Sequence, residues 1–199
     1  MEPFNILTNR AVPLDRANVD TDQIVPKQFL KQVGKTGFGN YLFYDWRFDS
    51  QGKAREDFVL NFPSYRGRKI LLTRENFGIG SSREHAVWAL YDFGFRAVIA
   101  PSFADIFYAN CFKSGLLPVR LAAREVDLLF DGDCEIVIDL PNQEVSACGK
   151  KFVFEVDSFR KNLLLEGTDT IGLTLKQESK ISAYESSDTL FKPGPAPVA

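Results

Sequence analysis

The sequence has 199 residues, 45% of them hydrophobic, which is enough for one domain with a substantial core. It carries 24 basic and 26 acidic residues, a formal charge of −2, so no global charge favours nucleic acid or an anionic membrane. No apolar run approaches the roughly 18 residues of a membrane span, and the first four residues lack the basic start of a signal peptide. We therefore expect a soluble, cytoplasmic protein.

The chain is poor in metal ligands. Its one histidine, His85, and its three cysteines are widely separated, whereas a structural zinc site takes about four such ligands and a catalytic site about three. A self-contained zinc or iron–sulfur site is therefore not expected. Because the cysteine count is odd and low, we expect Cys111, Cys134 and Cys148 to be free thiols in a reducing cytosol.

The first third of the chain has an irregular pattern, with short apolar runs interrupted by proline and glycine, which indicates short strands and long loops. Within it, residues 41–48 form an aromatic stretch with neither a helical nor an alternating period. Packing inside the domain is the favoured interpretation of this stretch. A contact surface or a loop lining a site are the alternatives.

From residue 69 the pattern becomes regular, and short apolar runs alternate with helical segments that end at a glycine. This alternation is typical of right-handed βαβ units with a parallel sheet. The expected strands are residues 69–73, 96–100 and 116–121, and the expected helices run from near residue 82 to Gly94 and from residue 103 to Gly115.

The remaining third predicts further elements but little chemistry. We expect a short helix over residues 124–130, strands over 135–139 and 151–156, the second of them half-buried and antiparallel, and a helix over 159–166. The proline-rich residues 191–199 predict a flexible tail. Residues 1–190 are expected to form a single α/β domain.

The most informative segment, NFGIGSSREH at residues 76–85, lies between an expected strand and an expected helix. Its glycines permit a tight turn and close approach of a ligand to the backbone. Ser81 and Glu84 have the spacing of a capping box, which would place free amides at the helix start, and Arg83 adds a planar cation suited to a carboxylate or phosphate. The pattern predicts an anion site. A plain helix cap, with Arg83 paired to a neighbouring acid, is the equal alternative.

Two further features carry weaker signals. His85 is a lone histidine, which is more often a structural group than a catalyst. Upstream, residues 18–24 read NVDTDQI, in which Asp20 and Asp22 would share a face if extended and could orient an arginine or bind a cation. An Asx-type turn is the favoured alternative for this pair.

These two motifs, with PSFADIF at residues 101–107 and GLLP at residues 115–118, resemble the swivel domain of the aconitase superfamily, and within it the small subunits of 3-isopropylmalate dehydratases. The resemblance implies a swivelling β/β/α domain with a mixed sheet. It also implies a hydro-lyase of leucine biosynthesis that interconverts 2-isopropylmalate and 3-isopropylmalate. The implied partner is a large subunit, in a heterodimer or heterotetramer, that carries a four-iron, four-sulfur cluster, so no cofactor is expected on this chain.

The resemblance also implies roles for individual residues. Ser81 would be the base that takes the substrate proton. Ser82 and Arg83 would hold a substrate carboxylate, with Gly80 beside them, and Asp22 would orient neighbouring groups. The amides and the arginine charge would stabilise the serine alkoxide where negative charge develops.

One departure from the aconitase pattern bears on the substrate. Aconitases place an arginine after this acidic segment to bind a third carboxylate, whereas this chain has the apolar residues Phe29 and Leu30 in that region. We hypothesise that one of them contacts the isopropyl group of the substrate. A related hydro-lyase for citramalate, citraconate or homoaconitate, and a non-catalytic anion-binding or scaffold module, are the alternative functions.

Overall fold

The computed structural model describes residues 1–31, 34, 36–81 and 83–187 of the chain, and within these it has two four-stranded sheets. One sheet is parallel and the other antiparallel. The prediction that the fold contains both parallel and antiparallel strands is confirmed, but the two kinds of strand form separate sheets. The parallel sheet has the order β2 (Ala11–Leu14), β3 (Ile70–Thr73), β4 (Ala97–Ala100) and β5 (Leu117–Arg120). The antiparallel sheet has the order β1 (Ile6–Asn9), β6 (Ile136–Asp139), β7 (Glu144–Ala147) and β8 (Lys150–Val153).

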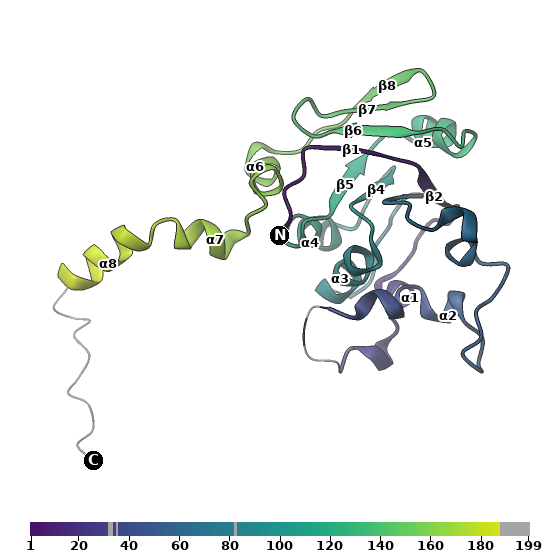
Figure 1. Cartoon of the computed structure of the whole chain (residues 1–199), viewed down its shortest axis with the longest axis horizontal. Helices are drawn as coiled ribbons and strands as arrows, with labels where there is room; N and C mark the ends of the chain where they lie inside the picture. Colours follow the sequence, from purple (N-terminus) through teal and green to yellow (C-terminus); the bar gives the residue numbers. More distant parts are fainter. Residues whose placement is uncertain (32–33, 35, 82, 188–199) are drawn as a thin grey trace, which may run out of the picture.

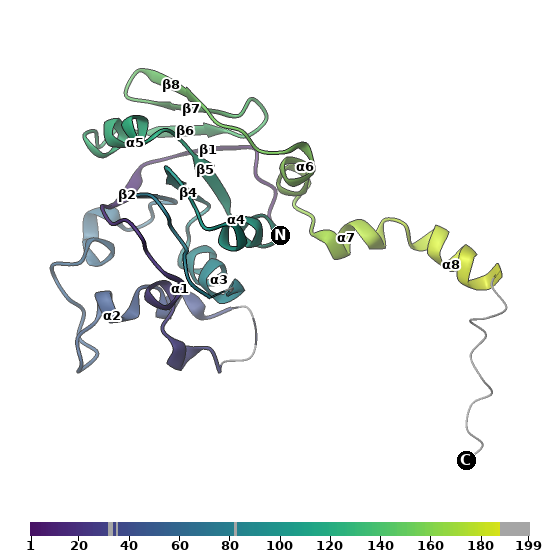
Figure 2. The same cartoon turned by 180° about the vertical axis from the view of Figure 1, so that it is seen from behind.

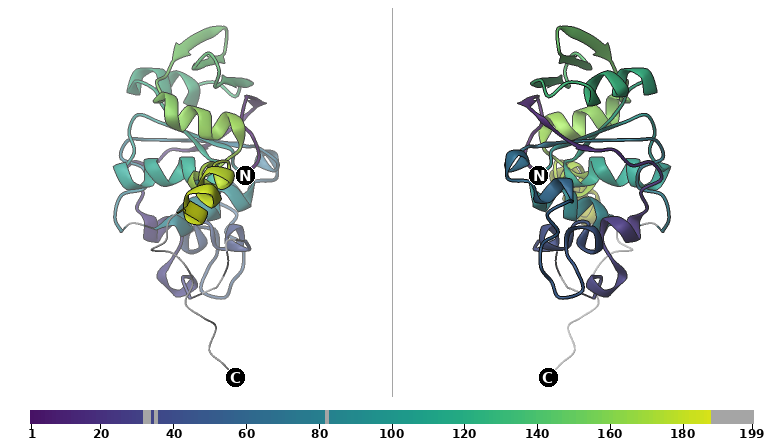
Figure 3. Two further views of the ribbon diagram at one scale, coloured as in Figure 1. Left: turned by 90° about the vertical axis from the view of Figure 1, so that its left-hand side faces the viewer. Right: turned by 90° about the vertical axis from the view of Figure 1, so that its right-hand side faces the viewer.

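The parallel sheet is the centre of the fold, and every residue of β3 and β4 is buried. Helices α3 (Glu84–Phe93) and α4 (Asp105–Ser114) connect β3 to β4 and β4 to β5, as the βαβ pattern predicted. They lie on one side of this sheet, while the antiparallel sheet and α5 (Ala123–Phe130) lie on the other (Figures 1 and 3). The predicted helix ends are also confirmed, because Gly94 and Gly115 adopt left-handed φ values of 116° and 81°.

The start of α3 differs from the predicted capping box. The helix begins at Glu84, its N-cap is Arg83, and no side chain caps it. The reason is that the preceding loop is held elsewhere, since the carbonyl of Ser81 accepts a hydrogen bond from the Thr21 hydroxyl. Ser81 therefore lies outside the helix rather than at its cap.

The short strands expected in the first third of the chain are present as β1 and β2, but short helices lie where long loops were expected. The aromatic stretch packs within the domain, because Leu42 and Phe43 are fully buried and the rings of Phe43 and Trp46 stack with centroids 5.4 Å apart. This confirms the favoured interpretation. The elements of this region are α1 (Thr21–Ile24), η1 (Lys27–Phe29), η2 (Phe38–Tyr41), α2 (Tyr44–Arg47), η3 (Val59–Asn61) and η4 (Pro63–Tyr65).

The prediction of three free thiols is wrong for two of the cysteines. Cys134 and Cys148 form a disulfide, with Cα atoms 5.7 Å apart. Cys134 precedes β6 and Cys148 follows β7, and the antiparallel pairing of Ile136 with Ala147 brings the two to the same end of the hairpin. Cys111 is free and buried in α4, and burial raises the pKa of its thiol well above the ordinary value.

The predicted helix after the antiparallel sheet is confirmed as α6 (Ser158–Glu166), which ends at Gly167. Two helices that the sequence did not predict follow it, α7 (Thr170–Leu175) and α8 (Glu178–Ser187). They extend away from the sheets (Figure 2). No helix in the described part of the chain is long and apolar enough to cross a membrane. The expected tail, residues 191–199, lies outside the described residues, and the expected domain over residues 1–190 stays a prediction.

Candidate active site

Three loops meet at the carboxyl-terminal edge of the parallel sheet, where β2, β3 and β4 end. Isolated parallel bridges tie them together, one between Asp20 and Ile79 and one between Phe77 and Phe103. The segment predicted to carry the chemistry thus lies between the acidic segment and the start of α4. In open α/β sheets, ligands bind outside the carboxyl ends of the strands, so this edge is the candidate site.

The two aspartates of the acidic segment have different roles. Asp20 is the N-cap of α1, where its carboxylate accepts a hydrogen bond from the Gln23 amide at 2.8 Å, and the Gln23 side chain accepts one from the Asp20 amide at 2.9 Å. The interpretation as an extended pair is therefore wrong. The alternative was an Asx-type turn, in which the aspartate carboxylate bonds to nearby backbone. Asp20 makes such a bond, but as the N-cap of a helix. Asp22 lies in the first turn of α1, and its carboxylate is available for another partner.

Gly78 is required by the shape of the loop. Its φ is +79°, and its amide donates to the Val19 carbonyl at 2.7 Å. A Cβ at this position would lie 2.2 Å from Cγ of Phe107. Gly80 also has a left-handed φ, of +96°. The predicted tight turn and close backbone approach are both present.

Ser81 is held by its backbone and exposed at its side chain. Thr21, which is buried, donates its hydroxyl to the Ser81 carbonyl at 3.0 Å. Among the described residues, none forms a hydrogen bond with the Ser81 hydroxyl. The loop is therefore fixed while this hydroxyl can face a ligand. Thr21 was missed by sequence reasoning, although its place between Asp20 and Asp22 was a signal.

Arg83 pairs with Asp22, its guanidinium donating to one carboxylate oxygen. Lys27 lies on the other side of that carboxylate, with its Nζ 3.5 Å from the second oxygen. The Arg83 side chain is only 12% exposed, so its orientation is set by this contact. An arginine has five N–H donors, so the predicted pairing with an acid leaves donors for a bound anion.

A cavity of about 260 Å³ lies beside this pair. It brings together three of the predicted site residues, Gly80, Ser81 and Arg83, and adds Thr21, Gly78 and residues 104–107. Residues 104–107 belong to the PSFADIF motif that supported the family resemblance, but the sequence analysis gave them no role in the site.

Three predicted residues do not line this cavity. Phe29 stacks on Tyr41 with ring centroids 4.1 Å apart, and Leu30 is half-buried against the core. Asp22 does not line the cavity, but it accepts a hydrogen bond from Arg83, which does. Ser82, predicted to hold a carboxylate, lies outside the described residues. The imidazole of His85 packs against Phe38 and Trp88, with centroids 5.1 and 4.8 Å away, which is a supporting position.

The described residues do not fit an iron–sulfur cluster or another bound metal. They contain no group of three or more His, Cys, Asp or Glu side chains that could hold a metal ion. Two of the three cysteines are bonded to each other, and Cys111 is buried inside α4. Cluster ligation needs accessible thiolates.

Comparison with known proteins identifies relatives over nearly the whole chain. Residues 1–124 match the family model of the aconitase C-terminal domain, and residues 170–193 match that of the C-terminal domain of the 3-isopropylmalate dehydratase small subunit. The chain is 55% identical over 201 residues to the 3-isopropylmalate dehydratase small subunit of Leptospira interrogans, covering 97% of this chain and 98% of that one. It is also 55% identical over 192 residues to the protein of the same name from Brevibacillus brevis, covering 94% and 99%.

A solved structure is similar as well. The crystal structure of 3-isopropylmalate dehydratase from Methanocaldococcus jannaschii aligns with a TM-score of 0.68 at 28% identity, covering 90% of this chain and 99% of that one. The unpredicted helices α7 and α8 fall within the region of the second family model.

Proposed function

Because this chain belongs to the family of 3-isopropylmalate dehydratase small subunits, we propose that its Ser81 hydroxyl exchanges the substrate proton while Arg83 binds a substrate carboxylate. The chain is the small subunit of a hydro-lyase of leucine biosynthesis, which interconverts 2-isopropylmalate and 3-isopropylmalate by removing and re-adding water. The function implied by the sequence motifs is confirmed by these relatives. The roles of the individual residues are our proposal.

One observation carries this proposal, the position of Ser81 at the cavity. Its side chain is exposed while its backbone is anchored to the buried Thr21, and Arg83 lines the same cavity. A group that takes and returns a proton must be held at a fixed place yet remain accessible to the substrate. Ser81 meets both conditions.

Dehydration breaks the C–H bond at one carbon and the C–OH bond at its neighbour. The electron pair of the C–H bond forms the double bond, and the electron pair of the C–O bond leaves with the hydroxide, so that proton and hydroxide together make up the water removed. The proton passes to the Ser81 oxygen, which must carry negative charge to accept it. On rehydration the water adds in the opposite sense, and Ser81 returns the proton to the carbon that lost the hydroxyl. The positive charge of Arg83 stabilises the serine oxygen while it is charged.

Arg83 and Lys27 flank the Asp22 carboxylate beside the cavity, and the charged side chains that line the cavity itself are Arg83 and Asp105. Asp22 lies between Arg83 and Lys27 and neutralises one charge, which leaves a net charge of +1 for these three groups. Asp22 thereby holds Arg83 in place, and the donors of Arg83 that do not face Asp22 can bind an anion. We assign to Asp22 the positioning of Arg83 and to Arg83 the contact with a substrate carboxylate.

We propose that this chain is active in a complex with a large subunit, as the term small subunit in the relatives' names suggests. The relationship to aconitase suggests a four-iron, four-sulfur cluster on that large subunit. The family's cluster would supply Lewis-acid chemistry at the leaving hydroxyl. We place the complex in the cytoplasm.

The test is Ser81→Ala in the complex reconstituted with the large subunit, assayed for isopropylmalate isomerisation. Loss of a general base lowers kcat by about 10²- to 10⁴-fold, and we expect this with assembly of the complex unchanged. Ser50→Ala, at another exposed serine, is the matched control and should keep the full rate. Retention of the wild-type rate by Ser81→Ala would contradict the assignment of the base.

A further inference from the structure

A second cavity lies at the opposite edge of the parallel sheet, away from Ser81. Its volume is about 510 Å³, within the range of small-molecule sites. Its walls include residues 66–69, which precede β3, and Gly94, which ends α3 before β4 begins. Ser81 instead follows β3, so the full length of the strand separates the two cavities.

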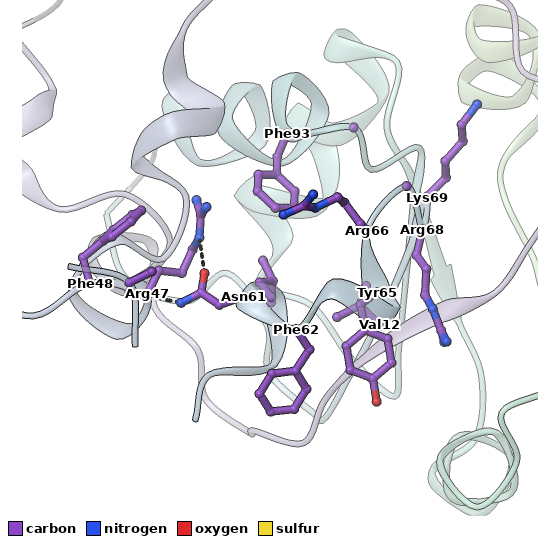
Figure 4. Close-up of a pocket in the computed structure, with 14 residues that line it drawn as sticks. Val12, Arg47, Phe48, Asn61, Phe62, Tyr65, Arg66, Arg68, Lys69 and Phe93 are labelled. Atoms are coloured by element: carbon purple, nitrogen blue, oxygen red, sulfur yellow. Dashed lines mark hydrogen bonds between the residues drawn. The ribbon is translucent and has the colours of Figure 1, made fainter. Parts of the chain in front are cut away.

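The charge of this cavity has one sign. Four cationic side chains line it and no aspartate or glutamate does. Arg68 is already neutralised, because it forms hydrogen bonds with Asp133 at 2.6 and 3.2 Å. Figure 4 shows Arg68 and Lys69 extending away from the space between Arg47 and Arg66. These last two arginines are therefore the cations that a bound group would meet.

Neither of the two arginines has a carboxylate partner among the described residues. Arg47 donates only to neutral oxygens, the carbonyls of Gly39 and Leu42 and the side chain of Asn61. Burial lowers the pKa of Arg47, which is the effect of removing a guanidinium from water without supplying an anion. Arg66 is exposed, and the described residues give its side chain no hydrogen bond or ion pair.

The rest of the wall is apolar and aromatic. The Arg47 guanidinium lies 4.9 Å from the ring centroid of Phe93, and Arg66 lines the same cavity (Figure 4). Phe62 and Tyr65 stack against each other with centroids 5.9 Å apart on another side of the cavity. A pocket lined by two cations without an acidic partner in the described part of the chain, and by aromatic side chains, suits a ligand that has an anionic group and an apolar body.

We propose that this cavity, lined by Arg47, Arg66 and Phe93, is a binding site for a small organic anion, separate from the dehydratase site. The anionic group, a carboxylate or a phosphate, is held between the two guanidinium groups. The apolar body of the ligand packs against the rings of Phe93 and Phe62.

The test uses the full chain and two probes that share a phenyl ring, benzoate and phenyl phosphate, with benzyl alcohol as the uncharged control. Binding is followed by the amide NMR signals of Gly67 and Gly94 at this cavity and of Gly78 and Gly80 at the other edge of the sheet. We expect saturable shifts at Gly67 and Gly94 with at least one of the two anions, and none with benzyl alcohol. The anion that binds more tightly identifies the preferred head group.

Arg66→Ala is the decisive variant, because Arg66 is exposed and its loss should leave the fold intact. We expect it to weaken binding about ten-fold, the factor for one lost charge-assisted contact. Arg124→Ala, at an exposed arginine on α5, is the matched control and should bind as the wild type does. Equal affinity in Arg66→Ala, shifts confined to Gly78 and Gly80, or no saturable binding of either anion would overturn the proposal.

The same titration on the complex with the large subunit separates a small ligand from a partner's acidic side chain. Binding at Gly67 and Gly94 that persists in the complex supports the proposal. Binding that disappears when the complex forms would overturn it, since the cavity would then be occupied by the partner protein.

Discussion

The guanidinium of Arg83 donates a hydrogen bond to the carboxylate of Asp22, although 61 residues separate them in the sequence. Arg83 is the N-cap of α3 and Asp22 lies in the first turn of α1, so the pair joins two loops at the carboxyl-terminal edge of the parallel sheet. The Asp22 side chain is 37% exposed. Because water reaches this carboxylate, the pair contributes modestly to stability, and its main effect is to fix the direction of the guanidinium of Arg83, whose side chain is 12% exposed.

Asp22→Ala should therefore impair the reaction more than the fold. Without its partner the Arg83 side chain loses its fixed direction, and we expect kcat/KM for isopropylmalate to fall about ten-fold or more, mainly through KM. Steady-state kinetics of the reconstituted complex measure this. Asp15→Ala is the matched control, because Asp15 pairs with Arg74 outside the cavity. An unchanged KM in Asp22→Ala would show that Asp22 does not position Arg83 for the substrate.

Gly78→Ala should destabilise the folded chain. The new Cβ would lie 2.2 Å from Cγ of Phe107 and 2.6 Å from its Cβ, so that the ring or the loop must move. Gly67→Ala is a matched control, because Gly67 has the same φ of +79° but no atom within 4 Å of a Cβ. We expect Gly78→Ala to lower the free energy of unfolding by about 1–3 kcal/mol more than Gly67→Ala, measured by urea denaturation. If both variants lost the same free energy of unfolding, the contact with Phe107 would contribute nothing and backbone strain alone would explain the loss.

The central sheet could be predicted from sequence because its signals are local. Residues 70–72 and 97–100 are continuous apolar runs, and they are fully buried within strands β3 and β4. Gly94 marked the end of α3 because left-handed backbone favours glycine. The signal of the site loop was also local, because Gly80, Ser81 and Arg83 lie within four consecutive residues. They were predicted as site residues together, and they line one cavity.

What the sequence could not predict depends on contacts between distant segments. The spacing of Ser81 and Glu84 fits a capping box, but a hydrogen bond from Thr21 holds Ser81 outside the helix. The disulfide of Cys134 and Cys148 follows from the pairing of β6 with β7, and β7 was not predicted. Polar and small residues at 144–147 gave that strand no apolar run to detect.

The disulfide should contribute measurably to stability. Fourteen residues separate the two cysteines, and closing a loop of this size is worth about 2–3 kcal/mol through the unfolded state. We expect one reactive thiol per denatured chain, that of Cys111, and three after reduction. Dithiothreitol should lower the free energy of unfolding of the wild type and leave a Cys134→Ser/Cys148→Ser double variant unaffected. Three thiols in protein purified without reductant would contradict the bond.

Asp133 links the two sheets in a way that depends on pH. It precedes β6, and it accepts hydrogen bonds from Arg68, which precedes β3 and also donates to the Ala11 carbonyl in β2. The hydrogen bond from Arg68 lowers the pKa of Asp133 below its ordinary value of 3.8. A lowered folded-state pKa stabilises the fold above the unfolded-state value, and this stabilisation is lost as the pH falls through the folded-state value.

Asp133→Asn should therefore reduce stability at pH 7 by less than about 1 kcal/mol, because the Asp133 side chain is 60% exposed. The difference between variant and wild type should disappear as the pH is lowered through the folded-state pKa of Asp133. Urea midpoints recorded across this range measure the effect. Asp131→Asn, at an exposed aspartate nearby, is the matched control for the loss of one surface carboxylate. A difference that persists at low pH would rule out the proton-linked explanation.

Leu30→Arg tests the hypothesis that an apolar residue after the acidic segment selects the isopropyl group. Leu30 is the better target of the two candidates, because Phe29 is engaged in its stack with Tyr41. Leu30 is the C-cap of η1, the short helix that begins at Lys27, and Lys27 contacts Asp22. An arginine at position 30 would therefore add positive charge near the site. We expect the ratio of kcat/KM for isopropylmalate to that for a tricarboxylate such as citrate to fall about ten-fold, the factor for one gained or lost charged contact.

Leu128→Arg, at an exposed leucine on α5, should leave the ratio as it is. The cavity beside Ser81 is lined without Leu30, so an unchanged ratio in Leu30→Arg would place the specificity in other residues, with Ile106 of that cavity the next to change.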